Sequence, residues 1–305
     1  MQLKASRIPT LLVTGCNGQV GFELRRSLAP LGRVVALDRS GCDLSRPDEI
    51  RRRVRELRPD VIVNPAAYTA VDKAEADAET AFAINATAAG VLAEEAKALG
   101  SLLVHYSTDY VFDGRKEGPY VETDAVAPQS VYGKSKLAGE LAVAATGAAA
   151  LVLRTCWVAG AHGGNFAKTM LKLARERDSL RVIADQFGAP TTAALIADVT
   201  AQIIARHWLF GERAEFAGGI YHLAAAGETS WHGYASEVVR YAAAKGVELK
   251  VDPAAIEAIP ATAYPLPAPR PSNSRLDTGK LRETFGIYLP DWQQGVHLLL
   301  DQILT

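Results

Sequence analysis

Cysteine is scarce in this chain of 305 residues, with only Cys16, Cys42 and Cys156, which stand far apart. Three scattered thiols lack the numbers of a disulfide framework and the spacing of a zinc site, so we expect a reducing compartment. No run of about 20 apolar residues occurs, so we expect no membrane span. The first apolar stretch is short and is broken at Gly15, unlike the apolar core of a secretory signal. These absences favour a cytoplasmic protein.

An excess of one charge is also missing. The chain has 33 Lys and Arg against 34 Asp and Glu, a net charge of −1. Nucleic-acid-binding proteins usually carry a basic excess, so we expect no nucleic-acid partner. The arginines of Arg51–Arg53 stand beside acidic residues and are interpreted as a solvated helix face. The six histidines show neither HxH nor HExxH spacing, and His105 is interpreted as a core histidine.

What the chain does contain is apolar sequence in short runs. Hydrophobic residues make up 49% and charged residues 22%, which is typical of a folded protein. Five nearly continuous apolar runs predict buried strands at Thr10–Thr14, Arg33–Leu37, Val61–Asn64, Leu102–Ser107 and Ala150–Thr155. Helices are predicted between them at Gln19–Leu28, Pro47–Leu57 (N-capped by Ser45), Ala74–Leu99 and Val131–Ala145. This alternation predicts an α/β protein with a doubly wound, parallel-sheet Rossmann fold.

The second half of the chain has a different texture. Two short strands are predicted, at Val182–Ala184 and Tyr221–Leu223, and residues 253–271 are rich in proline and predicted to be mostly loop. Helices are predicted at Ala193–His207, Tyr234–Ala244 and Asp291–Leu304. We therefore divide the chain into a dinucleotide-binding domain, 1–158, and a smaller C-terminal substrate-binding lobe, mainly 159–305, with some segments returning to the first domain.

A glycine-rich loop follows the first predicted strand. Gly15, Gly18 and Gly21 are spaced three and three apart, and a predicted helix begins within the loop. In such a loop the glycines permit a tight turn, close approach of backbone N–H groups to a pyrophosphate, and close packing of the helix on the sheet. The helix N-terminus adds free N–H groups for the phosphates. The predicted cofactor residues of this loop are Gly15, Asn17, Gly18, Gln19, Val20 and Gly21.

Further cofactor contacts are predicted where the second and third strands end. Asp38 is placed to bind the adenosine ribose, and Arg39 beside it suits a 2′-phosphate, so NADH and NADPH both remain open. Asp43 and Leu44 follow in a loop suited to the adenine, although Asp43 suits a turn before Ser45 equally well. After the third strand, the small residues Ala66 and Ala67 leave room for a cofactor.

A candidate proton donor follows the fourth strand. Tyr132 and Lys136 are four residues apart, one helical turn from each other on one face. A nearby ammonium lowers the pKa of a tyrosine, which then serves as a general acid near neutral pH. A hydroxyl at the end of the fourth strand, from Ser107 or Thr108, can bind the same carbonyl oxygen. The pattern therefore predicts Tyr132, Lys136 and one of these two hydroxyls as a catalytic group.

These motifs are similar to those of the extended short-chain dehydrogenase/reductase superfamily, and the chain most closely resembles the dTDP-4-dehydrorhamnose reductase family within it. The blocks that carry this resemblance run in order along nearly the whole chain. They are NPAAYTAVDKAE (64–75), HYSTDYVFDG (105–114), VYGKSKLAGE (131–140), LRTCWV (153–158), NFAKTM (165–170), DQFGAPT (185–191) and RPSNSRLDT (270–278).

The resemblance implies that NADPH or NADH reduces the C4 ketone of dTDP-4-dehydro-L-rhamnose to give dTDP-L-rhamnose, the last step of dTDP-rhamnose biosynthesis. Tyr132 would protonate the ketone oxygen, and Thr108 would bind the same oxygen, since the family motif places its hydroxyl residue there and not at Ser107. Lys136 would tune Tyr132 and hold the nicotinamide ribose. The resemblance thus implies Thr108, Tyr132 and Lys136 as the catalytic residues, the last two also contacting the cofactor. The resemblance also implies substrate contacts by four further residues, Tyr110, Trp157, Asn165 and Arg270. The structural alternatives are a core aromatic for Trp157, a helix N-cap for Asn165 and an ion pair for Arg270.

Some members of the family are described as dimers bridged by Mg²⁺ through glutamates. Glu23 matches one such position, but Ala194 and Gln293 stand where the others would be. Mg²⁺ is therefore kept as a cofactor alternative, no metal ligand is assigned, and a homodimer stays open.

Two other functions fit parts of this pattern. The first is another sugar-nucleotide enzyme of the superfamily, an epimerase or a 4,6-dehydratase. A dehydratase would place a glutamate after Asp109, where this chain has Tyr110. The second is a non-catalytic, NADP-binding regulatory subunit, which is disfavoured because Thr108, Tyr132 and Lys136 are all present.

Overall fold

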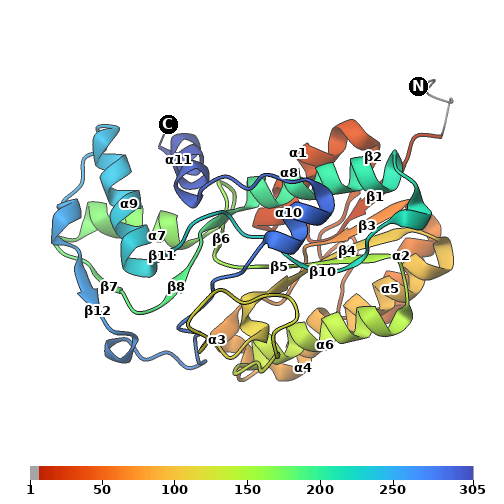
Figure 1. Cartoon of the computed structure of the whole chain (residues 1–305), viewed down its shortest axis with the longest axis horizontal. Helices are drawn as coiled ribbons and strands as arrows, with labels where there is room; N and C mark the ends of the chain where they lie inside the picture. The colour runs from red at the N-terminus through yellow and green to blue at the C-terminus, as the bar shows by residue number, and fades with distance from the viewer. Residues whose placement is uncertain (1–6, 305) are drawn as a thin grey trace.

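The computed structural model describes residues 7–304 (Figure 1). Residues 1–6, which belong to the predicted first domain and to the N-terminal stretch judged unlike a secretory signal, lie outside the described residues, as does Thr305. A parallel sheet of six strands forms the centre, in the order β10-β5-β4-β3-β1-β2. Its strands are β1 (Thr10–Val13), β2 (Arg33–Ala36), β3 (Val61–Asn64), β4 (Leu102–Thr108), β5 (Ala150–Thr155) and β10 (Gly219–His222).

Helices cover both faces of this sheet, which confirms the predicted α/β Rossmann architecture (Figure 1). One face packs against α1 (Gln19–Leu28), α8 (Ala193–Ile203) and α10 (Gly279–Phe285). The other packs against α2 (Pro47–Leu57), α5 (Ala88–Leu99) and α6 (Val131–Thr146). Strands β1, β3 and β4 are buried throughout, because side chains on both faces meet helices.

A smaller body lies beside the sheet, on the left of Figure 1, and has a hydrophobic core of its own. Its helices are α7 (Phe166–Glu176), α9 (Trp231–Ala244) and α11 (Trp292–Ile303). Pairs of short strands complete it: β7 (Arg181–Ile183) with β12 (Glu257–Ile259), β8 (Phe187–Gly188) with β11 (Thr229–Ser230), and β6 (Val158–Ala159) with β9 (Thr191–Thr192).

The chain passes between the two cores more than once. Residues of α8, β10 and α10 pack in the core of the large sheet, although they follow α7 in sequence. The predicted strand at Tyr221–Leu223 is thus the edge strand β10 of that sheet, beside β5. We retain the division at residue 158 as a proposal, with these three elements assigned to the first domain.

The predicted helix over Ala74–Leu99 is wrong as a single element. The segment forms α3 (Val71–Ala74), α4 (Ala78–Phe82), a π turn (Ala83–Thr87) and then α5. The wide turn lies where α6 approaches, and a Cβ at Gly139 would come within 2.1 Å of the Asn85 carbonyl oxygen. The buried Asn85 side chain binds Tyr68 backbone and Ser135 Oγ, so tertiary contacts determine this interruption.

The other predicted boundaries of helices and strands differ less from the observed ones. Arg46, not Ser45, is the N-cap of α2, because Ser45 Oγ instead donates to Asp43 Oδ1 at 2.8 Å. The helices α7 and α10 were not predicted, and the strand predicted at Val182–Ala184 begins one residue earlier. The remaining short helical segments are Ala29–Leu31, Asp109–Val111, Ile204–Leu209, Arg213–Glu215, Pro253–Ala255 and Ala261–Ala263. Within residues 7–304, no helix is both long and apolar enough to span a bilayer.

Candidate active site

The order of the strands creates a crevice at the carboxyl edge of the sheet. The chain runs from β1 outward to β2 and then returns to β3 on the other side of β1. Loops that follow β1 and β3 therefore diverge, and such a point is where α/β sheets bind nucleotides. The loop after β1 begins at Gly15 and the loop after β3 contains Ala66, and these two residues are in contact.

The glycine loop is shaped for close approach of a dinucleotide. Gly15 has φ +54°, and a Cβ there would lie 2.7 Å from Ala66 Cβ. A Cβ at Gly21 would lie 2.2 Å from the Gly15 carbonyl oxygen, so α1 packs directly on the loop. The N-cap of α1 is Gly18, which makes no side-chain cap bond. The first N–H groups of α1 and the absence of side chains at these glycines thus fit a pyrophosphate.

Two predicted loop residues have partners within the chain. Gln19 Oε1 accepts from Gly160 N at 2.8 Å and from Asn165 Nδ2 at 3.1 Å. Gln19 therefore ties the glycine loop to the segment after β5. Asn17 Nδ2 donates to Asp38 Oδ2 at 3.1 Å, and Val20 packs against the core of the large sheet.

The end of β2 presents an ionised carboxylate. Asp38 Oδ1 accepts from Ser40 N and Oγ and from Gly41 N, and these hydrogen bonds lower the pKa of Asp38. Arg39 is 80% exposed, with one ion pair of 3.6 Å to Asp43. A carboxylate and an exposed guanidinium thus follow each other at this strand end, and their roles toward a cofactor stay a prediction.

The predicted adenine loop is partly a structural element. Asp43 Oδ1 accepts from Ser45 N at 3.0 Å, which is the turn interpretation considered for this residue. Leu44 is buried in the core with Ile50 and Val54. Its side chain is therefore a core side chain, whereas Ala66 and Ala67 after β3 are partly exposed.

The three predicted catalytic residues lie at the end of β4 and the start of α6. Thr108 is the last residue of β4, and Tyr132 and Lys136 lie in the first turns of α6. Ser130 caps this helix, its Oγ accepting from Gly133 N at 3.1 Å. A Cβ at Gly133 would lie 2.3 Å from the carbonyl oxygen of Tyr110, so the start of α6 is pressed against the Thr108–Tyr110 segment.

The electrostatics of this group differ from the expectation that Lys136 lowers the pKa of Tyr132. Burial raises the pKa of Tyr132 to about 12, while the Thr108 hydroxyl favours the tyrosinate and the Asp109 charge opposes it. The Lys136 ammonium donates instead to the Tyr106 carbonyl oxygen at 2.6 Å. Burial also lowers the pKa of Lys136 to about 8, against the opposing charge of Glu140.

A buried carboxyl that was not predicted as a site residue lies beside Thr108. Asp109 is 2% exposed, and its Oδ1 accepts from Thr108 Oγ1 at 3.1 Å. Burial raises the pKa of Asp109 to about 6. The position of Asp109 between Thr108 and Tyr110 was the available signal, but no sequence pattern reveals that it is buried.

A cavity of about 800 Å³ separates the sheet edge from the smaller body. Three predicted substrate residues, Tyr110, Trp157 and Arg270, line it. The Tyr110 ring contacts that of Tyr132 edge-on, with centroids 5.5 Å apart. The cavity thus extends from Tyr110, the neighbour of the candidate proton donor, toward α7 and α9.

Trp157 is held firmly in the wall of this cavity. Its φ of +46° lies in the left-handed region, which is uncommon for a residue other than glycine. The indole stacks on Trp231 with centroids 3.6 Å apart, and a Cβ at Gly188 would lie 2.7 Å from Trp157 Cε2. Trp231 was not predicted as a site residue, because no local sequence pattern connects it with Trp157.

Asn165 and Arg270 have structural partners that match the alternatives considered for them. Asn165 caps α7, its Oδ1 accepting from Lys168 N at 3.1 Å. Arg270 lines the cavity and pairs with Asp72 through Nη2 and Oδ2 at 2.7 Å. Arg270 thus faces the cavity while its charge is compensated.

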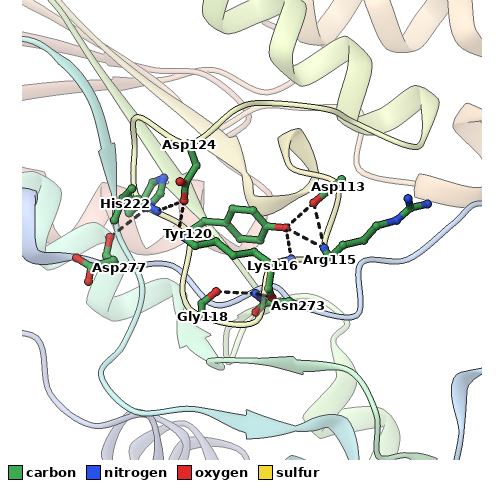
Figure 2. Close-up of polar contacts among 10 residues, drawn as sticks. Asp113, Arg115, Lys116, Gly118, Tyr120, Asp124, His222, Asn273 and Asp277 are labelled. Atoms are coloured by element: carbon green, nitrogen blue, oxygen red, sulfur yellow. Dashed lines mark hydrogen bonds and ion pairs between the residues drawn. The ribbon is translucent and has the colours of Figure 1, made fainter.

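The segment that carries Arg270 is fastened to the loop before α6, as Figure 2 shows. In that loop, the Tyr120 hydroxyl donates to Asp113 Oδ1 at 2.6 Å and accepts from the backbone of Arg115 and Lys116. Asn273 Nδ2 donates to the carbonyl oxygens of Lys116 and Gly118. These bonds fix the 270–278 segment at the rim of the cavity.

Glu23 has a cation of its own chain as partner. It is buried, and its Oε2 lies 3.1 Å from Arg26 Nε. Among residues 7–304, no three His, Cys, Asp or Glu side chains gather as a metal-binding group. His105 is fully buried in β4, in agreement with its interpretation as a core histidine.

Comparison with known proteins places the chain in one family. The family described as RmlD substrate binding domain matches residues 9–305. A dTDP-4-dehydrorhamnose reductase of Burkholderia thailandensis is 52% identical over 295 residues, covering 97% of this chain and 99% of the relative. The enzyme of the same name from Escherichia coli (strain K12) is 48% identical over 299 residues, covering 97% of this chain and 98% of the relative.

Solved structures agree with this placement. A crystal structure of dTDP-4-dehydrorhamnose reductase from Bacillus anthracis, in complex with NADP, has a TM-score of 0.88 and 32% sequence identity. It covers 97% of this chain and 100% of that chain. A dTDP-glucose 4,6-dehydratase from Streptomyces venezuelae, 20% identical with a TM-score of 0.75, covers 96% of each chain and shares the fold.

Proposed function

The chain belongs to the dTDP-4-dehydrorhamnose reductase family, and from this premise we propose that it reduces the C4 ketone of dTDP-4-dehydro-L-rhamnose to give dTDP-L-rhamnose. It is an oxidoreductase that uses a nicotinamide cofactor, NADPH or NADH. The observation that carries the proposal is the position of Thr108 and Tyr132, at the end of β4 and the start of α6, where both contact Tyr110 in the wall of the 800 Å³ cavity.

The chain's own residues would hold the cofactor along the crevice. Backbone N–H groups of the Gly15–Gly21 loop would bind the pyrophosphate, and Asp38 with Arg39 would bind the adenosine ribose or its 2′-phosphate. Lys136 would hold the nicotinamide ribose. When bound, the reduced cofactor supplies the hydride, and the protein orients and polarises the reactants.

Tyr132 would donate its phenolic proton to the oxygen of the C4 ketone. Because Tyr132 has a pKa of about 12, the hydroxyl is protonated at neutral pH and able to donate. Thr108 would bind the same ketone oxygen. Thr108 also accepts from Tyr110 N at 3.3 Å, which orients its hydroxyl at the strand end.

The cavity would hold the rest of the substrate. We assign the sugar to the wall formed by Tyr110 and Trp157. We assign the diphosphate to Arg270, whose guanidinium suits bidentate phosphate binding and is kept at the cavity by Asp72. Asn165 is assigned an indirect part, because its amide holds Gln19 in the glycine loop.

We place the reaction in the cytoplasm, since the three cysteines are free thiols, which suits a reducing compartment. The proposed partner is a dTDP-sugar, with no nucleic acid or membrane, and a homodimer remains a prediction to be tested by sedimentation.

The test measures oxidation of NADPH and of NADH in the presence of dTDP-4-dehydro-L-rhamnose. Wild type should turn over, and Tyr132→Phe should lower kcat by about 10²–10⁴-fold, the usual contribution of a general acid. Tyr288→Phe is the matched control, because Tyr288 is 80% exposed. Turnover that survives in Tyr132→Phe would remove Tyr132 as the proton donor. A folded, NADPH-binding wild type without net cofactor oxidation would overturn the reductase assignment, and product analysis for an epimer would then follow.

A further inference from the structure

A chain of buried polar side chains crosses the sheet beneath the crevice and ends at Lys136. Thr14 Oγ1 lies 2.5 Å from Asn64 Oδ1, and Asn64 Nδ2 lies 3.1 Å from His105 Nδ1. The second ring nitrogen, His105 Nε2, lies 3.4 Å from Lys136 Nζ. Thr14 directly follows β1, Asn64 ends β3, His105 lies in β4, and Lys136 lies in α6. Thr14, Asn64, His105 and Lys136 are each at most 2% exposed, so water does not compete for these contacts.

The protons in this chain are constrained by the ammonium at its end. Lys136 has three N–H donors and no acceptor, and it gives one donor to the Tyr106 carbonyl oxygen. A proton on His105 Nε2 would place two donors, this N–H group and the Lys136 ammonium, against each other. Nε2 must therefore present a lone pair to Lys136 as long as Lys136 is charged, and the ring proton then lies on Nδ1.

The amide of Asn64 adapts to either arrangement. An amide group keeps the same outline when its oxygen and nitrogen exchange places, so its orientation follows from the hydrogen bonds around it. A proton on His105 Nδ1 requires Oδ1 and Nδ2 of Asn64 to exchange places, so that Oδ1 faces the ring and Nδ2 donates to Thr14 Oγ1. The contacts from Thr14 to Lys136 then each join one donor and one acceptor.

We propose that His105 is a positioning residue of the reductase: its neutral ring, protonated on Nδ1 and oriented by Asn64 and Thr14, accepts a hydrogen bond from the Lys136 ammonium through Nε2. This hydrogen bond and the one to the Tyr106 carbonyl hold the ammonium against β4. Tyr132 lies one turn before Lys136 on the same helix. The two hydrogen bonds of the ammonium therefore fix where Lys136 meets the cofactor and Tyr132. The inference rests on the proposed function for the role of Lys136, but not for the protonation of His105.

The surrounding charges are consistent with this arrangement. Burial and the Lys136 charge hold the pKa of His105 well below its usual value, so the ring stays neutral. Two titratable groups face Lys136 among the described residues, His105 on β4 and Glu140 on the next turn of α6. Arg154 on β5 is bound to Glu140 at 2.6 Å. His105 is therefore the uncharged acceptor of this site.

The first experiment reads the tautomer directly and needs no substrate. Long-range ¹H–¹⁵N correlation spectra of the full chain, with the signals of His105 identified by their loss in His105→Gln, distinguish a ring protonated on Nδ1 from one protonated on Nε2. We expect the Nδ1-protonated form near neutral pH. A ring protonated on Nε2, or a charged ring, would overturn the proposal.

The second experiment compares two variants of His105 in the reductase assay. Leucine fills the space without an acceptor, whereas the side-chain amide of glutamine reaches the position of Nε2. We expect His105→Leu to lower kcat by about ten- to a hundredfold with a smaller change in KM, the order of loss produced by misplaced reacting groups. The alkaline limb of its pH profile should move to lower pH, because an apolar neighbour disfavours the ammonium. His105→Gln should recover most of kcat and the wild-type limb.

His297→Gln is the matched control, since His297 pairs with Glu237 on the smaller body. Wild-type kcat and pH profile in His105→Leu would refute the positioning role even if the tautomer were as expected. Equal damage in the leucine and glutamine variants, with no shift of the limb, would assign His105 to packing alone and also overturn the proposal. If wild type showed no turnover, the proposed function would fail, while the tautomer measurement would still decide the state of His105.

Discussion

Replacing Glu140 by glutamine should destabilise the protein far more than one lost hydrogen bond would suggest. The Glu140 carboxylate binds the Arg154 guanidinium through two contacts, Oε1 to Nε at 2.8 Å and Oε2 to Nη2 at 2.6 Å. The two side chains are 1% and 3% exposed. In Glu140→Gln the charge of Arg154 would remain in the interior without its carboxylate.

The magnitude follows from this burial. Removing one member of a buried ion pair typically costs about 3–5 kcal/mol, because the other charge is left uncompensated. Arg154 Nη1 already lacks a hydrogen-bond partner among the described residues, so little nearby compensates. The double variant Glu140→Leu/Arg154→Met removes both charges, and we expect it to recover to within about 2 kcal/mol of wild type.

Urea unfolding followed by tryptophan fluorescence measures these differences, as a lower midpoint at unchanged slope. The control is Glu56→Gln, which removes an exposed i,i+4 partner of Arg52 and should change stability by no more than about 0.5 kcal/mol. A loss below about 1 kcal/mol in Glu140→Gln would refute the argument from charge burial. A double variant as unstable as the single one would attribute the loss to packing instead.

Three further predictions test other parts of the site. Folding raises the pKa of Asp109 from 3.8 to about 6, so the stability that depends on its protonated form is complete at low pH and is lost as pH rises through 6. Wild type should therefore lose about 3 kcal/mol relative to Asp109→Asn between about pH 3 and pH 8 in urea unfolding, and equal pH dependence of the two proteins would contradict this. Gly21→Ala should weaken NADPH binding by about tenfold or more in a fluorescence titration, since its Cβ would lie 2.2 Å from a loop carbonyl oxygen, while Gly118→Ala, with open space around it, should not. The stacked indoles of Trp157 and Trp231 should give an exciton couplet in circular dichroism that Trp231→Leu abolishes; a couplet that persists would place the stacking elsewhere.

Much of the large sheet is determined locally, by the sequence itself. Strands buried on both faces must be apolar throughout, which is why β1, β3, β4 and β5 were recognisable as short continuous runs. The glycine spacing reflects a local requirement as well, because side chains at Gly15 and Gly21 would collide with the loop. The spacing of Tyr132 and Lys136 determines that both side chains share one face of α6.

Other features depend on residues that meet only in the folded chain. Arg270 finds Asp72 across 198 positions, and Trp157 finds Trp231 from another element. The π turn at Ala83–Thr87 interrupts a helical sequence because α6 packs close to Asn85. None of these contacts leaves a periodic signal, since its partners are not neighbours in sequence.

The state of Lys136 shows most clearly which features follow from the sequence and which depend on the tertiary structure. Its spacing from Tyr132 predicted a cation close to a tyrosine, and hence a lowered tyrosine pKa. The fold instead directs the ammonium to the Tyr106 carbonyl oxygen and toward His105, and buries both ionisable groups. The sequence by itself determined which residues share the helix face. Only the tertiary structure decided their charges, because desolvation and buried hydrogen bonds depend on everything that surrounds a side chain.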